Sequence, residues 1–208
     1  MYSFLFVAWY TPQNLKSKKS GKHMRITKYL RADQEAITRF LAVLGSGSVI
    51  LSTSKRARPS FFIFAHGFIK EYIEEGFFRK EELLIKALED GGFPADDGPI
   101  AAMKNDQKKS HDAAETMFHA AKHWQVGEEE ARTDVGWATS EYTSTIRQHL
   151  DRLKNLIFPL LEQTISIEEE HKVSEDMNSI IFEGSLKEGA EKYIKLIEQL
   201  EEELADWK

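Results

Sequence analysis

The segment from about residue 133 to about residue 165 repeats inward-facing side chains at steps of three and four. The stripe consists of Tyr142, Ile146, His149, Leu153, Leu156 and Leu160. Because an α-helix turns once every 3.6 residues, side chains at these steps lie on one face. The pattern predicts a long helix that buries one side in a core, and it places one histidine, His149, on that buried side.

Three earlier segments have the same period. The first stripe is Leu30, Gln34, Ile37, Leu41 and Leu44, and we expect this helix to stop at the run Gly45-Ser46-Gly47-Ser48. A second helix is predicted from near Ser60 to about Asp90, where Gly91 and Gly92 follow. After a turn-forming linker at residues 93–99, a third helix carries the stripe Met103, Gln107, Ser110, Ala114, Met117 and Ala121 and ends between Trp124 and Gly127.

Four long helices joined by short or moderate loops predict an all-α, antiparallel up-down four-helix bundle over about residues 28–166. An acidic tail follows, and we expect it to form outer helices over about residues 173–207, with a break at Gly184. Residues 1–23 are predicted to be an N-terminal extension, either disordered or the product of a mis-called start. The domain is therefore expected to span residues 24–208.

Composition limits the chemistry and the partners. The chain has no cysteine, which leaves histidines and carboxylates as possible metal ligands. Residues 16–31 hold seven Lys and Arg and no acid, whereas residues 162–208 hold fourteen acids against five bases, and the net charge is −6. This balance argues against nucleic acid as the partner. The apolar run at residues 3–10 is too short to cross a membrane, and its positive charges follow it. We therefore expect a cytoplasmic protein without a membrane partner.

Four local features together resemble bacterial and archaeal hemerythrin-like (HHE cation-binding) proteins. Residues 79–92 resemble the His-His-x-Lys-Glu-Glu segment of that family, and Gly98-Pro99-Ile100-Ala101-Ala102-Met103 resembles its Gly-Pro-Ile-x-x-Met entry to the third helix. Residues 149–159 resemble its His-Ile-x-Lys-Glu stretch, which closes with Leu-Phe-Pro. Residues 174–177 and 191–193 are similar to its outer helices.

The resemblance implies two non-haem irons, held by histidines from all four helices and by bridging glutamates. Carried over residue by residue, it retains His149 and Glu81 as metal ligands. It also places Gln34, Phe77 and Phe78, Gln107 and Leu153 at positions where the family has ligands. A shift of one residue on the second helix would instead place Gly76 and Lys80 there. Because Gln is a poor iron ligand and Phe and Leu are none, a diiron cofactor is expected to be absent or altered.

Without metal, the buried amides and imidazole must find other partners. We expect Gln34, Gln107 and His149 to hydrogen-bond with one another, with Glu81 or with water. His111 is expected at the edge of this polar cluster, and no partner is predicted for His66 or His171. His119 and His123 form a pair four residues apart, one turn beyond Glu115. This spacing can bind zinc or nickel, but the pair is expected to face solvent.

The leading hypothesis is a degenerate hemerythrin-like protein that has lost the diiron site and acts as a binding, regulatory or structural module. The alternative is a functional non-haem iron protein that binds or senses oxygen or iron, with His149 and Glu81 in an unorthodox ligand set. Neither a nucleophile–base pair nor a phosphate-binding loop is visible in the sequence, so an enzyme is not predicted.

Overall fold

The computed structural model describes residues 24–52, 57–188 and 190–207. The predicted extension at residues 1–23 lies outside them. The helices that build the bundle are α1 (Arg25–Leu51), α2 (Pro59–Phe68), the π-helical segment η2 (Ile69–Phe78), α3 (Arg79–Asp90), α4 (Gly98–Gln125), α5 (Ala131–Arg152), the π-helical segment η3 (Leu153–Ile157) and α6 (Phe158–Thr164). Two C-terminal helices follow, α7 (Ile167–Glu188) and α8 (Ala190–Asp206). No strand occurs in these residues.

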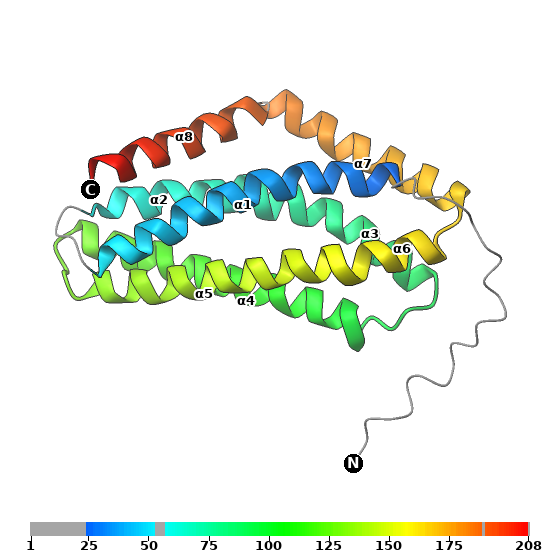
Figure 1. Ribbon diagram of the computed structural model, residues 1–208, viewed down its shortest axis with the longest axis horizontal. Coiled ribbons are helices and arrows are strands. Elements are labelled where there is room, and N and C mark those ends of the chain that lie inside the picture. Colours follow the sequence, from blue (N-terminus) through cyan, green and yellow to red (C-terminus); the bar gives the residue numbers. More distant parts are fainter. Residues whose placement is uncertain (1–23, 53–56, 189, 208) are drawn as a thin grey trace, which may run out of the picture.

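The chain runs up and down the long axis of the molecule four times (Figure 1). The continuous rod α2–η2–α3 forms the second pass and the rod α5–η3–α6 forms the fourth. Around the bundle, α5 packs against α1 and α4, and α4 packs against α2. The helices α7 and α8 form an arch over α1 and the second rod, on the side away from α4 and α5 (Figure 1). The predicted all-α antiparallel bundle with additional C-terminal helices is confirmed.

Local signals fix several helix ends. The Asp97 carboxylate accepts a hydrogen bond from the backbone N–H of Gly98 at 2.7 Å and caps α4. Gly92 and Gly127 have φ values of +93° and +103°, which L side chains rarely adopt, and they end α3 and α4. At the start of α7, Ser166 and Glu169 exchange backbone and side-chain hydrogen bonds of 2.8 and 3.2 Å, which is a capping box.

The expected stop of the first helix at its Gly-Ser run is wrong, because α1 continues to Leu51. The glycine serves packing instead. A Cβ built on Gly47 would lie 2.6 Å from Cε1 of the buried Phe61 ring. Ser46 Oγ donates to the carbonyl of Ala42 within the helix, and Ser48 Oγ donates to the carbonyl of Gly136 on α5. The small residues therefore let α1 approach its neighbours closely.

The buried stripe of the fourth rod shifts by one residue at η3. The N–H of Phe158 bonds to the carbonyl of Leu153, five residues back, so the wider turn adds a residue. As a result Ile157 and Leu161 are fully buried, whereas Leu156, predicted on the inner face, is 48% exposed. Pro159 follows directly and lacks the N–H that an α-helical turn would use there.

The C-terminal helices are longer than expected and dock firmly. The predicted break at Gly184 is wrong, since α7 extends to Glu188; nothing lies within 4 Å of a Cβ built on Gly184, and an exposed glycine lowers helix stability without ending the helix. Near the end of α8 the buried ring of Trp207 packs on Phe61, with centroids 4.9 Å apart. Within the described ranges, no helix is long and apolar enough to cross a membrane.

Candidate metal centre

Glu81 and His149 meet in the centre of the bundle. Both side chains are 0% exposed, and His149 Nε2 lies 3.0 and 2.8 Å from the two carboxylate oxygens of Glu81. From α4, Gln107 donates its amide Nε2–H to Glu81 Oε2 at 3.0 Å. With Nε2–H donating to the carboxylate, one glutamate holds an imidazole and an amide from two other helices. We call Glu81, Gln107 and His149 the core triad.

A second charged pair, which the sequence analysis missed, borders the core triad. The Asp106 carboxylate on α4 is buried and forms an ion pair with the Arg152 guanidinium on α5. Its Oδ2 also lies 3.8 Å from His149 Nδ1, which has no hydrogen-bond partner among the described residues. Asp106 follows Met103 by three residues and precedes Ser110 by four, so the helical period could have placed it on the inner face.

A third polar cluster joins the second rod to α1. Lys80 Nζ pairs with the Asp33 carboxylate of α1, and both side chains are mostly buried, at 12% and 14% exposed. Tyr72 donates its hydroxyl to the other Asp33 oxygen at 3.1 Å. Of the two neighbouring residues, Glu81 is the one that points to the bundle centre. This position agrees with the register that places Phe77, and not Gly76, at a ligand position of the family. Lys80 reaches inward as well, toward α1.

The other positions where the family resemblance expects metal ligands hold side chains that bind metal ions weakly or not at all. Phe77 and Leu153 are each 1% exposed and belong to the apolar core. Phe78 places its ring edge-on to His149, with centroids 5.4 Å apart. Gln34 is not part of the core triad; its Nε2 lies 3.5 Å from the carbonyl oxygen of Leu150.

This set of residues does not fit a pair of irons. A dinuclear site needs several imidazoles and at least one carboxylate per metal. Here a single imidazole, that of His149, meets two carboxylates, Glu81 at 2.8 Å and Asp106 at 3.8 Å, and both carboxylates already have partners in the protein. The positive charge beside Asp106 is supplied by the Arg152 guanidinium, so this carboxylate needs no metal as its counter-ion. In the part of the chain that the structure describes, no group of three or more His, Asp and Glu side chains is arranged to hold a metal ion.

Tyr142 lies two turns before His149 on the same helix, and its hydroxyl is buried. It has no hydrogen-bond partner among the residues described. Burial raises the pKa of Tyr142 well above its ordinary value, and the nearby Glu74 carboxylate raises it further. The phenol therefore stays neutral in the folded chain.

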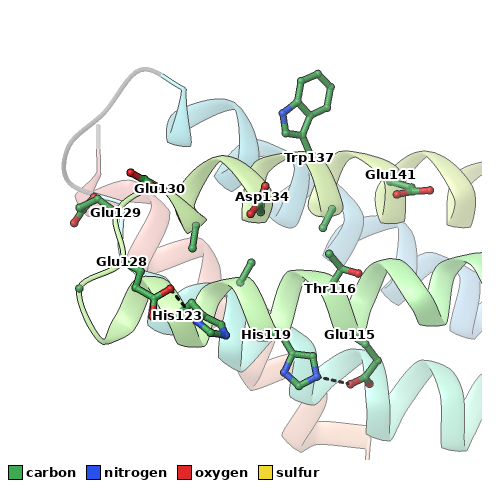
Figure 2. Close-up of a pocket in the computed structure, with 14 residues that line it drawn as sticks. Glu115, Thr116, His119, His123, Glu128, Glu129, Glu130, Asp134, Trp137 and Glu141 are labelled. Atoms are coloured by element: carbon green, nitrogen blue, oxygen red, sulfur yellow. Dashed lines mark hydrogen bonds and ion pairs between the residues drawn. The ribbon is translucent and has the colours of Figure 1, made fainter.

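The other histidines lie nearer the surface. The sequence predicts His111 at the edge of the polar cluster, but it is half exposed and its Nδ1 pairs instead with Glu74, at 3.0 Å. His66 has a partner that the sequence did not reveal, since its Nε2 lies 3.1 Å from Glu115 Oε1. His171 is exposed on α7. His119 and His123 project from successive turns of α4 beside a surface hollow (Figure 2), and the prediction that they face solvent is confirmed.

The chain is an antiparallel four-helix bundle, and a carboxylate and an imidazole meet at its centre, which is where such bundles build metal and cofactor sites. The sequence model of the hemerythrin HHE cation binding domain matches residues 25–161. The chain therefore belongs to the hemerythrin HHE cation-binding family. No curated protein and no solved structure matches it.

Proposed function

We propose that this chain is a degenerate member of its family, without the usual dinuclear iron centre, and that it works as a binding, regulatory or structural module. The proposal rests on the two hydrogen-bond partners of Glu81. The carboxylate that would bridge two metals in the family accepts hydrogen bonds from Gln107 and His149 instead. The two retained candidate ligands, His149 and Glu81, thus satisfy each other. A cytoplasmic location remains a prediction from the sequence.

Positive charge supplied by the protein supports the same proposal. In a diiron protein, the buried carboxylates offset the charge of the metals. Here the buried Asp106 has Arg152 as its counter-ion, and Asp33 has Lys80. Neither ion pair leaves a carboxylate in need of a metal. Phe77 and Leu153 fill volume that ligands would occupy in the family, and burying such a side chain stabilises the fold by about 2 kcal/mol.

The direct test is the metal content of the purified chain. The protein is expressed with added iron, purified without chelator, and analysed by elemental analysis and by absorption spectroscopy. We expect far less than one iron per chain and a spectrum that contains only tryptophan and tyrosine bands. A content of about two irons per chain with an oxo-bridge absorption would establish a dinuclear centre and overturn the proposal.

The alternative, a functional non-haem iron protein for oxygen or iron, has one observation in its favour. His149, Glu81 and Asp106 come from three helices, and both carboxylates lie within 4 Å of the imidazole, at 2.8 and 3.8 Å. Such a centre would hold a single iron, and this iron would be lost when His149 is replaced with Gln. Iron bound at one equivalent per chain, and lost in His149→Gln, would favour this alternative.

Restoring the missing metal ligands tests whether their absence explains the loss of iron binding. The triple variant Gln34→His, Gln107→His and Leu153→Glu returns three donors to the positions that the family uses. If missing donors explain the loss, this variant gains iron. The matched control carries Leu153→Gln in place of Leu153→Glu, which has nearly the same shape without the charge. Iron binding by neither variant would show that the missing ligands alone do not explain the absence of iron.

A further inference from the structure

A stripe of three potential metal ligands lies on the outside of α4, away from the core triad. Glu115, His119 and His123 are spaced four residues apart, so they project from one face over two turns. The side chains of His119 and His123 are 70% and 60% exposed. Two histidines in this spacing on one helical face are a recurrent arrangement for binding a transition metal ion.

His123 makes a contact with a carboxylate that metal-binding histidines commonly make. Its Nδ1 lies 2.9 Å from Glu128 Oε2, in the turn that follows α4 (Figure 2). When Nδ1–H donates to this carboxylate, the lone pair of Nε2 is left free to bind a cation. Histidines that bind metals nearly always donate their other N–H to a carboxylate, a carbonyl or water, because this fixes the tautomer and the ring orientation.

Glu115 offers a third donor. Its Oε1 contacts His66 Nε2 at 3.1 Å and Lys70 Nζ at 3.3 Å, which anchors the carboxylate. Its Oε2 faces His119 Nε2 at 3.9 Å (Figure 2), too far for a hydrogen bond. This oxygen is therefore available to a cation next to His119.

The surroundings favour a cation. The hollow beside this stripe, between α4 and α5, is lined by further carboxylates and by no Lys or Arg side chain. These carboxylates are Glu128, Glu129, Glu130, Asp134 and Glu141. Their summed negative potential raises the local concentration of cations. Carboxylates alone select no particular ion, but imidazole nitrogens favour zinc, nickel and copper over magnesium and calcium.

We propose that His119 and His123, with Glu115 Oε2, bind one divalent late transition metal ion of the zinc type, and that Glu128 orients His123. The described side chains do not yet converge on one point as a metal site requires. Exposed imidazoles change rotamer within nanoseconds, so the His119 ring can turn toward an ion at Nε2 of His123 while Glu128 holds the His123 ring in place. Water fills the remaining coordination position. The site shares no residue with the core triad, and it stands or falls independently of the proposed function.

Zinc titration of the full chain tests the proposal. Isothermal calorimetry with ZnCl2 should show one site, and His119→Ala together with His123→Ala should abolish it. Glu128→Gln keeps the shape but loses the charge, and it should weaken binding about tenfold. The matched control is His111→Ala, which removes another solvent-accessible histidine from the same helix and should leave zinc binding unchanged.

Proton NMR of the histidine rings identifies the ligands independently of affinity. We expect zinc to shift the ring resonances of His119 and His123 and to leave those of His149 in place. Equal zinc affinity in the double-alanine variant and the native chain would overturn the proposal. Zinc-induced shifts confined to His149 would also overturn it, because the ion would then occupy the core.

Discussion

The core triad and the exposed histidine stripe of α4 contain nearly the same chemistry in opposite surroundings. His149 lies 2.8 Å from the Glu81 carboxylate, and His123 lies 2.9 Å from the Glu128 carboxylate. The first pair is fully buried and the second is about 60% exposed on both sides. Distance alone therefore does not distinguish the two pairs, and burial decides what each of them can do.

Because the Glu81–His149 pair is buried, it must stay intact for the fold to be stable. A buried carboxylate without partners is very costly, so Glu81 must keep the donors of His149 and Gln107. These side chains are not free to rotate toward another ligand. Water can satisfy the His123–Glu128 pair when it opens, and such a pair contributes little to stability. On the proposed function, the buried Glu81 and His149 act as structural hydrogen-bonding groups, whereas His119 and His123 on the surface can still turn toward a ligand.

The largest expected effect comes from removing the shared acceptor of the core triad. Glu81→Ala leaves His149 and Gln107 buried without their partner, and it should lower the free energy of unfolding by about 3–5 kcal/mol. Urea denaturation measures this change. Glu82→Ala, at the exposed neighbouring position, is the matched control and should change it by less than about 0.5 kcal/mol. Similar losses in both variants would contradict the structural role of the core triad.

A smaller effect is expected at the edge of the core, where the counter-ion is partly solvated. Arg152→Met leaves the Asp106 carboxylate buried without its cation. Because the Arg152 side chain is 18% exposed, the loss should be about 2–3 kcal/mol, below the range for a fully buried pair. Lys154→Met, at an exposed position two residues along, controls for the loss of a positive charge. If both variants unfold at the same urea concentration, Asp106 does not depend on Arg152.

Sequence periodicity predicted the passes of the bundle because each long helix buries one continuous stripe. The resemblance to the hemerythrin-like family, not periodicity, placed Glu81, Gln107 and His149 together, since they fall at positions where that family has ligands. Neither could find Arg152 as the partner of Asp106, or Asp33 as the partner of Lys80, because these pairs join different helices and only the packing brings them together. The position of Leu156 was wrong because a single π-helical turn at η3 shifts every later residue of the stripe.

Gly47 is another residue whose role depends on packing between helices, which the sequence pattern does not show. From the sequence its Gly-Ser run predicts the end of a helix, but in the fold the missing side chain makes room for Phe61. Gly47→Ala should lower the free energy of unfolding by about 1–2 kcal/mol through overpacking. Gly45→Ala is the matched control: its Cβ would meet only Arg147 Nη2, at 3.5 Å, and it should stabilise the helix by about 0.5–1 kcal/mol. Thermal unfolding of both variants measures this difference in sign.

Removing a buried polar group that has no partner should raise the free energy of unfolding, whereas removing Glu81 from the core triad should lower it. Tyr142→Phe removes a buried hydroxyl that has no described hydrogen-bond partner, and it should raise the free energy of unfolding by about 1 kcal/mol near neutral pH. Burial raises the pKa of Tyr142, so the native chain should also lose stability as the pH rises above about 10, where the unfolded chain ionises first. Tyr142→Phe should flatten this alkaline decline.

Tyr72→Phe is the control for Tyr142→Phe. Burial raises the pKa of Tyr72 as well, with the Asp33 charge as a second cause, so this variant should also flatten the alkaline decline. Unlike Tyr142, however, Tyr72 donates a hydrogen bond to Asp33 at 3.1 Å. It should therefore lose stability at neutral pH, where Tyr142→Phe gains it. Urea denaturation at neutral and alkaline pH separates the two effects, and a loss of stability in both variants at neutral pH would mean that the Tyr142 hydroxyl has a partner.

The smallest effect is expected on the exposed stripe. Without metal, His119→Ala together with His123→Ala should change the free energy of unfolding by less than about 0.5 kcal/mol, because both rings are solvated and no core contact depends on them. With zinc at one hundred times its dissociation constant, the native chain should gain about 2.7 kcal/mol and the double variant nothing. Thermal unfolding with and without zinc measures both quantities. A large loss in the double variant without zinc would show that the stripe stabilises the fold as much as the core triad does, and the difference between the two regions would then disappear.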